Sequence, residues 1–286
     1  MQAQAIRVIG VIGAGQMGAG IAQVMAQSGL SVVVQDIGQP YLENGLNSIR
    51  QSLDRLVKKG KMGEDQKRET LGRLRTTLDL AEMRTAQVVI EAATENVRVK
   101  EEIFRKLDEI TPAATILATN TSSISITHIG AATARPDRVI GMHFMNPVPL
   151  MELVEIIRGL RTSEETFQCI QALTRKVAKT PVEAQDFPGF IVNRILMPMI
   201  NEAVYALYEG VGKPADIDAA MRLGTNQPMG PLTLADLIGL DTCLAIMEVL
   251  HTGLGDSKYR PCPLLKKYVE AGYLGRKVKR GFYTYE

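Results

Sequence analysis

The chain has 286 residues, of which 45% are hydrophobic and 22% are charged, and its formal net charge is +2. This length allows two domains, and the near-neutral charge without a long basic block argues against nucleic acid as a partner. We see no signal-peptide pattern and no apolar run near the roughly 18 residues of a membrane span, so we expect no membrane partner. The three scattered cysteines, Cys169, Cys243 and Cys262, indicate reduced thiols and a cytoplasmic protein.

The first elements along the chain are expected to form a βαβ unit. The β-branched run of residues 6–13 predicts a buried strand, and the small residues 14–29 predict a helix that stops at Gly29. A second strand is expected over residues 31–36, ending at Asp36. The unit therefore has the order of a dinucleotide-binding motif.

Strands and helices continue to alternate up to about residue 186. Buried strands are expected over residues 86–93, 115–119, 138–144 and 150–157. A helix over residues 41–60 has apolar side chains at helical spacing, namely Leu42, Leu46, Ile49, Leu53 and Leu56. A helix over residues 95–110 should bury a face that includes Val99, Ile103 and Leu107. This alternation predicts a mainly parallel sheet covered on both faces.

From Phe190 onward the pattern is helical with almost no strand signal. Helices are expected over residues 191–210, 214–223, 232–250 and 262–272. We therefore predict an α/β domain over residues 1–186, with a Rossmann-like sheet, and an all-α domain over residues 187–286.

The stretch GAGQMG, from Gly13 to Gly18, is a G-x-G-x-x-G motif between a strand and a helix, and Asp36 follows Gly18 by 18 residues. Its glycines allow a tight turn, close approach of a pyrophosphate, and close packing of the helix on the strand. Unpaired N–H groups at the helix start favour phosphates. Asp36 would accept a hydrogen bond from a ribose 2′-hydroxyl and repel a 2′-phosphate. This predicts NAD, although a rearranged loop after Asp36 could admit NADP; the alternative is close packing without a ligand.

Two charged residues follow the strand over residues 86–93. Glu95 and Lys100 are expected at the cofactor crevice, because strand ends line it in a doubly wound sheet. Alternatively, Glu95 caps its helix and Lys100 is exposed to solvent.

His143 ends a strand just before the stiff Asn146-Pro147-Val148-Pro149 turn. Alternation in the next strand places Glu155 on an apolar face, where a carboxylate needs a partner, and His143 is the expected one. Such a pair orients the imidazole and suits a general base that takes a hydroxyl proton as hydride leaves for a nicotinamide. Glu152 is a rival carboxylate. The alternative is a core histidine with Glu155 at the surface.

Several other polar residues stand out less. His128 and His251 lie in helical segments and are expected to be structural or exposed; with no cysteine cluster, we expect no metal site. Asn193 interrupts an apolar helix and is expected to face a polar cleft between the domains. One further group could either bond a substrate oxygen or cap the next helix: Asn120, Thr121, Ser122 and Ser123.

Seven segments occur together in order: VIGAGQMGAGIAQ, EAATEN, NTSSISI, GMHFMNPVPLMELVEII, DFPGFIVNR, MGPLTLADLIGLDT and GYLGRKVKRGFY. With them the chain resembles the L-3-hydroxyacyl-CoA dehydrogenases over essentially its whole length, and within that family the bacterial 3-hydroxybutyryl-CoA enzymes. The resemblance implies a Rossmann-like first domain, a helical second domain that forms a homodimer, NAD as cofactor and an acyl-CoA substrate. It implies reversible oxidation of a (3S)-3-hydroxyacyl-CoA.

The resemblance also implies roles for single residues. His143 matches the family's catalytic histidine, Glu155 rather than Glu152 matches its partner, and Ser122 and Asn193 match substrate-positioning residues. Ser52 and Lys59 match coenzyme A contacts, although Lys58, Lys59 and Lys61 could be only a solvated helix end. Met145 replaces a frequent phenylalanine and could alter acyl-chain preference. The implied cofactor contacts are Gly13, Gly15, Gln16, Met17, Gly18, Asp36, Glu95, Lys100, Ser122 and Asn146.

Two other functions stay open from the sequence. One is a dehydrogenase of a sugar acid such as L-gulonate, with the same fold and the same histidine–glutamate pair. The other is a non-enzymatic dinucleotide-binding structural protein, against which the intact His143 and Glu155 argue. The acyl-chain length and the physiological direction do not follow from the sequence.

Overall fold

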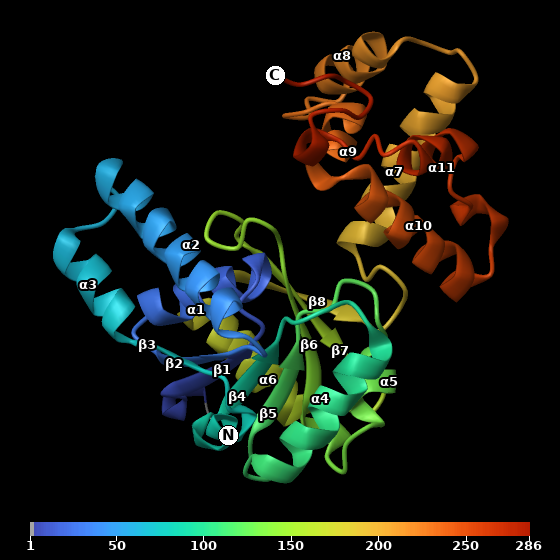
Figure 1. Cartoon of the computed structure of the whole chain (residues 1–286). Helices are drawn as coiled ribbons and strands as arrows, with labels where there is room; N and C mark the ends of the chain where they lie inside the picture. Colours follow the sequence, from blue (N-terminus) through green and yellow to red (C-terminus); the bar gives the residue numbers. More distant parts are fainter. Residues whose placement is uncertain (1–2) are drawn as a thin grey trace. The chain divides into compact units, whose positions relative to one another are not determined.

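A computed structural model describes residues 3–286, which form two compact units that meet in the chain at Asp186 and Phe187 (Figure 1). The first unit is built on an 8-stranded sheet with the order β3-β2-β1-β4-β5-β6-β7-β8. All neighbouring strands are parallel except β6 and β7, which are antiparallel. The strands are β1 (Val8–Ile12), β2 (Ser31–Gln35), β3 (Leu74–Thr77), β4 (Val88–Glu91), β5 (Ile116–Thr119), β6 (Val139–Phe144), β7 (Leu153–Arg158) and β8 (Thr180–Gln185).

Helices cover both faces of this sheet. Apolar side chains of α1, α2 and α6 share one buried cluster with the strands, whereas Figure 1 shows α4 and α5 on the other face. The helices are α1 (Gln16–Gln27), α2 (Gln39–Lys58), α3 (Glu64–Gly72), α4 (Val97–Ile110), α5 (Ile126–Gly130) and α6 (Glu164–Lys176). Short 3₁₀ turns lie at Ala3–Ala5, Leu80–Thr85 and Pro136–Arg138. The predicted fold class, a Rossmann-like mainly parallel sheet followed by helices, is confirmed.

The buried face of α4 differs from the one we expected. Lys100, Phe104 and Leu107 are buried, whereas Val99 is 39% exposed and Ile103 is half-buried. The helix is rotated because Lys100 points toward the sheet and pairs there with the buried carboxylate of Glu91. The prediction from apolar spacing was therefore wrong for Val99 and Ile103, which border an open cavity instead.

Two strands of the sheet were not expected from the sequence. β3 and β8 are the two edge strands, and neither has a continuous apolar pattern. β8 contains Pro181, which a sheet tolerates at its edge because that position has no ladder bond to lose. Edge strands are half exposed and therefore lack the pattern that identifies buried ones.

The second unit is helical, as predicted. Its core joins Met197, Leu232, Cys243, Met247 and Leu250 with other apolar side chains. The helices are α7 (Val192–Tyr208), α8 (Pro214–Gly224), α9 (Pro231–Ile238), α10 (Leu240–Leu254) and α11 (Pro263–Glu270), with 3₁₀ turns at Ser257–Tyr259 and Arg276–Val278.

One predicted helix of this unit, over residues 232–250, is in fact two. Gly239 separates α9 from α10 with a φ of +103°, a conformation that favours glycine.

Cys169, Cys243 and Cys262 are all buried free thiols. Within residues 3–286, the structure has no helix that is both long and apolar enough to span a bilayer.

Candidate active site

The glycine loop joins β1 to α1 and leaves room above the start of the helix. Gly13 has a φ of +94°, and its N–H donates to the carbonyl oxygen of Gln35 at 2.8 Å. A Cβ at Gly18 would collide with the carbonyl oxygen of Gly13, whereas a Cβ at Gly15 would meet nothing within 4 Å. No side chain caps α1, and its first turn holds no acidic residue. The open backbone and the positive end of α1 therefore fit a pyrophosphate.

Asp36 lies beside this loop in a cavity of about 700 Å³, which Gly13, Gly15 and Ile37 also line. Its Oδ2 accepts a hydrogen bond from the N–H of Ala14 at 2.7 Å, and its Oδ1 accepts one from the N–H of Ile37 at 2.7 Å. Each carboxylate oxygen can accept more than one bond. The cavity therefore offers phosphate-binding backbone and a hydroxyl acceptor together, which fits a dinucleotide with a free ribose hydroxyl.

Lys100 is buried rather than solvated, and it is paired with an acid that sequence reasoning missed. Its Nζ lies 2.6 Å from Oε2 of Glu91, at the end of β4, and the two side chains are 2% and 0% exposed. Thr119 donates to the same oxygen at 2.8 Å. The second charged neighbour of Lys100 is Glu95, at 3.8 Å. The alternative that Glu95 caps its helix is wrong as well, because Asn96 caps α4.

Glu95 instead gathers the hydroxyl groups that follow β5. Its Oε1 accepts hydrogen bonds from Thr121 Oγ1 at 2.6 Å, Ser122 N at 2.9 Å, Ser122 Oγ at 3.2 Å and Ser123 Oγ at 3.0 Å. Burial raises the pKa of Glu95, but the charge of Lys100 and these hydrogen bonds outweigh it and hold the pKa below its usual range. The carboxylate therefore stays charged and orients Ser122.

The remaining residues after β5 serve the neighbouring elements. Asn120 Oδ1 accepts from the N–H of Phe144 at 2.9 Å, so it ties the end of β5 to the strand that carries His143. The cap of α5 is Ser125, whose side chain accepts from the N–H of His128. The capping alternative for Asn120, Thr121, Ser122 and Ser123 is therefore wrong.

His143 and Glu155 face each other across β6 and β7. The antiparallel register pairs the two residues directly, and His143 Nδ1 lies 2.8 Å from Glu155 Oε2. Glu155 is 0% exposed and His143 is 7% exposed. Glu152 precedes β7 and is exposed, so it is not the partner. A neutral imidazole that donates from Nδ1 carries its lone pair on Nε2, which is the form a proton acceptor needs.

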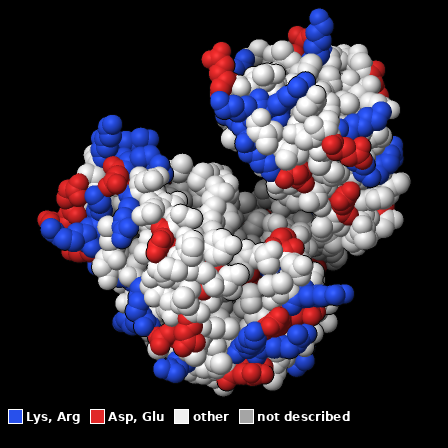
Figure 2. All heavy atoms as spheres, viewed as in Figure 1, with Lys and Arg blue, Asp and Glu red and all other residues white. Residues whose placement is uncertain are grey.

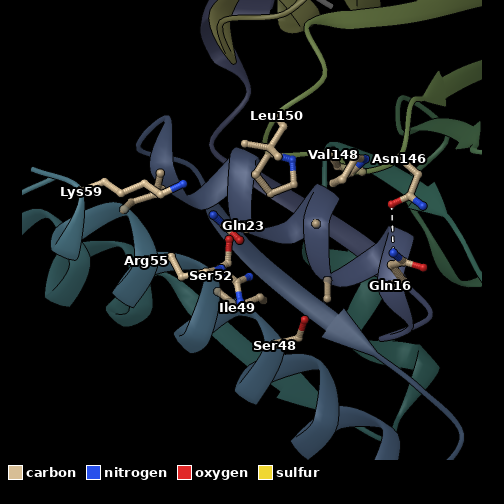
Figure 3. A pocket seen from close by; sticks show the side chains of 15 residues that line it. Gln16, Gln23, Ser48, Ile49, Ser52, Arg55, Lys59, Asn146, Val148 and Leu150 are labelled. Carbon is tan, nitrogen blue, oxygen red and sulfur yellow. Dashed lines mark hydrogen bonds between the residues drawn. The ribbon is translucent and has the colours of Figure 1, made fainter. Parts of the chain in front are cut away.

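A second cavity, of about 280 Å³, lies between α1, α2 and the turn after β6 (Figure 3). Ser52 and Lys59 line it, as does Arg55, which sequence reasoning missed. The signal for Arg55 was its spacing, because i+3 and i+4 place all three side chains on one face of α2. Asn146 Oδ1 accepts from Gln16 Nε2 at 3.0 Å at the edge of this cavity.

Basic side chains gather over the far end of α2, in the part of Figure 2 that corresponds to the upper end of this helix in Figure 1. Lys58, Lys59 and Lys61 are exposed there, but Lys59 also lines the cavity. A cluster of this sign suits an anionic ligand.

The other predicted residues are less informative. Met17 packs against the core of the first unit. Asn193 lies in the first turn of α7 and is 8% exposed, and its role stays a prediction. His251 is exposed, and the exposed His128 lies 2.6 Å from Glu101. Across the described part of the chain, no three His, Cys, Asp or Glu side chains are grouped so that they could hold a metal ion.

Comparison with known proteins gives a consistent result. Residues 8–187 match the family model described as "3-hydroxyacyl-CoA dehydrogenase, NAD binding domain", and residues 189–285 match "3-hydroxyacyl-CoA dehydrogenase, C-terminal domain". The chain is 56% identical over 283 residues to a 3-hydroxybutyryl-CoA dehydrogenase of Bradyrhizobium diazoefficiens, covering 99% of this chain and 97% of the relative.

More distant relatives and solved structures agree. The chain is 41% identical to the mitochondrial hydroxyacyl-coenzyme A dehydrogenase of Homo sapiens, over 98% of this chain and 92% of the relative. A crystal structure of (S)-3-hydroxybutyryl-CoA dehydrogenase from Ralstonia eutropha matches with a TM-score of 0.96 and 51% identity, covering 99% of this chain and 100% of that one. The chain therefore belongs to the 3-hydroxyacyl-CoA dehydrogenase family, and its first unit is the NAD-binding domain of that family.

Proposed function

We propose that this protein catalyses the reversible, NAD-dependent oxidation of (3S)-3-hydroxybutyryl-CoA to acetoacetyl-CoA. The names of the relatives support the substrate, since several are 3-hydroxybutyryl-CoA dehydrogenases. The observation that carries the chemistry is the buried contact of 2.8 Å between His143 and Glu155 at the end of β6. A histidine held by a carboxylate suits a general base near neutral pH.

His143 is the proposed base, and it accepts the proton of the 3-hydroxyl group through Nε2. Glu155 keeps the imidazole in the right tautomer and stabilises the positive charge that forms on it. NAD, when bound, supplies the acceptor for the hydride that leaves C3. The loss of this hydride and of the hydroxyl proton converts the alcohol to a ketone, so the atoms and electrons balance.

The surrounding residues would bind and orient the two ligands. Gly13, Gly15, Gln16, Met17, Gly18 and Asp36 are proposed to hold the dinucleotide, together with Glu95, Lys100, Ser122 and Asn146. Ser122 and Asn193 are proposed to position the substrate oxygens. Ser52 and Lys59 are proposed to contact coenzyme A, which the cavity beside α2 and its basic residues support.

The wider setting of the protein is part of the same proposal. We infer a homodimer formed through the helical unit from the resemblance to the family, and a cytoplasmic location from the three free cysteines. The acyl-CoA substrate is the partner that the basic residues on α2 favour.

The experiment that tests this function is steady-state oxidation of NADH and of NADPH by the pure protein with acetoacetyl-CoA. We expect rapid turnover with NADH and slow turnover with NADPH, because the Asp36 carboxylate repels a 2′-phosphate. Rapid turnover with NADPH alone would keep the reaction but refute the role of Asp36. No turnover with either, together with oxidation of L-gulonate by NAD, would replace the proposed substrate.

A further inference from the structure

The turn after β6 forms one wall of the cavity beside α2, and a buried lysine forms hydrogen bonds with the backbone of this turn. Lys179 lies just before β8 and is 9% exposed. Its Nζ donates to the carbonyl oxygens of Val148 and Met151, each at 2.7 Å. Lysine is almost never buried unless its ammonium group is paired or hydrogen-bonded. The two carbonyl groups therefore define the place of this side chain.

The same turn is anchored at two other points, both on α1. Val148 is 2% exposed and packs onto α1 at Gly20, where an added Cβ would lie 2.8 Å from the Cβ of Val148. At the start of α1, Gln16 bonds Asn146 at 3.0 Å. The inner side of the turn is thus held by α1 and by Lys179.

The outer side of the turn faces the cavity. Leu150 is 71% exposed and lines the cavity with Val148, and Figure 3 shows these residues across from Arg55 and Lys59 of α2. None of the residues that line this cavity lines the cavity of Asp36. Lys179 bonds residues 148 and 151 of the turn, whereas Asn146, the proposed dinucleotide contact, is held separately by Gln16. A shift of residues 148–151 would therefore change the cavity beside α2 without changing the cavity of Asp36 directly.

We propose that Lys179 is a positioning residue for the acyl-CoA substrate, which acts through residues 148–151 of the turn to hold one wall of the coenzyme A cavity. This inference rests on the proposed function. Lys179 does not touch the substrate; its two charge-assisted hydrogen bonds hold the backbone on either side of Leu150. Binding of the acyl-CoA then loses less conformational entropy, because this wall of the cavity is ordered before the ligand binds.

The test compares Lys179→Met, Lys179→Arg and Lys176→Met. Lys176 is a matched control, because it is three residues away and its Nζ also donates to a backbone carbonyl, that of Ile6, at 3.3 Å. In Lys179→Met we expect the KM for acetoacetyl-CoA to rise about tenfold, as for the loss of charge-assisted bonds, with kcat within about twofold. The Kd for NADH, measured by fluorescence, should be unchanged.

The two other variants decide whether this effect is positional. Lys179→Arg keeps the donors and should restore most of the affinity, and Lys176→Met should leave both constants as they are. An unchanged KM in folded Lys179→Met, or an equal loss of NADH and acyl-CoA affinity, would overturn the proposal. If Lys179→Met does not fold, Lys179→Gln replaces it, because its amide is uncharged and one atom shorter and cannot form both charge-assisted bonds. An unchanged KM in Lys179→Gln would also overturn the proposal.

Calorimetry with coenzyme A itself separates this inference from the proposed reaction. Weaker coenzyme A binding in Lys179→Met, with a wild-type protein that does not reduce acetoacetyl-CoA, would refute the reaction and keep the role of Lys179. Normal turnover by the wild type with equal coenzyme A binding in both proteins would refute only the role of Lys179.

Discussion

The two units of the molecule satisfy their buried carboxylates in different ways. In the first unit, Glu155 faces His143 at 2.8 Å and Glu91 faces Lys100 at 2.6 Å. Each carboxylate is thus paired with a side chain that can gain or lose a proton.

In the second unit, buried carboxylates are held by neutral donors. Asp236 is 1% exposed and accepts from the N–H groups of Phe282 at 2.9 Å and Tyr283 at 3.0 Å, and from the hydroxyl of Tyr285 at 2.9 Å. Asp218 accepts in the same way, from residues at the start of α9 and from Tyr283. These bonds tie the last residues of the chain to α8 and α9.

The difference separates a carboxylate that can assist proton transfer from one that only stabilises a fold. A neutral N–H or hydroxyl donor stabilises the charge of a carboxylate, but it does not gain or lose a proton at neutral pH. An imidazole beside a carboxylate can take up a proton during a reaction. We therefore expect changes in the first group to alter turnover and changes in the second to alter stability.

The largest effect is expected for His143→Gln, because glutamine can still bond Glu155 but cannot act as a base. We expect kcat to fall about 10²- to 10⁴-fold, the usual contribution of general acid–base catalysis, with NADH binding retained. Steady-state kinetics and NADH fluorescence measure the two quantities. His128→Gln is the control, since His128 is exposed and its ring pairs with Glu101, away from His143 and Glu155. A fall of less than about threefold would rule out the proposed base.

Glu155→Gln should have the next largest effect, since it keeps the shape of the pair and removes its charge. The imidazolium formed during oxidation then loses its counter-charge, and we expect kcat to fall about 10- to 100-fold. The Tm should be measured in parallel. A variant with a lowered Tm but an unchanged kcat would show that Glu155 is structural, like Asp236.

Asp236→Asn should change stability rather than turnover. The amide group of asparagine would face hydroxyl and N–H donors, so at least one buried bond is lost, at a cost of about 1–3 kcal/mol. Urea unfolding should show this loss, while kcat per folded molecule stays within about twofold of the wild type. A large loss of kcat with unchanged stability would break the distinction between the two units.

The smallest effect concerns alkaline pH and the second unit. Burial and the hydrogen bond to Asp218 raise the pKa of Tyr283 well above its ordinary value of 10.0. The folded protein therefore keeps this proton while the unfolded chain loses it near pH 10, so its contribution to stability is full below pH 10 and is lost as pH rises toward the folded-state pKa.

Tyr283→Phe should remove that dependence. The unfolding free energy of the variant should fall less steeply than that of the wild type between about pH 9 and pH 11. Tyr208→Phe serves as the control, since Tyr208 is 51% exposed. Equal slopes for the wild type and Tyr283→Phe would show that the phenol adds nothing to the alkaline transition.

Much of the candidate site followed from local patterns. The glycine loop was predictable because a tight turn, a helix start and an acid at the end of the next strand all lie within one βαβ unit. The pair of His143 and Glu155 was predictable because a stiff turn and strand alternation together set a register. The role of Glu91 was not predictable, because it lies inside the apolar run of residues 86–93 and has no neighbour along the chain that marks it.

The sequence by itself determined the family, the order of the elements and the residues that resemble those of known dehydrogenases, because each depends on neighbours along the chain. Only the tertiary structure decided which buried charges meet. Lys100 reaches Glu91 through a rotation of α4 that apolar spacing did not predict, and Lys179 reaches the turn before β7 from the short segment between α6 and β8. These contacts follow from desolvation, since a buried charge must find a partner wherever the fold supplies one.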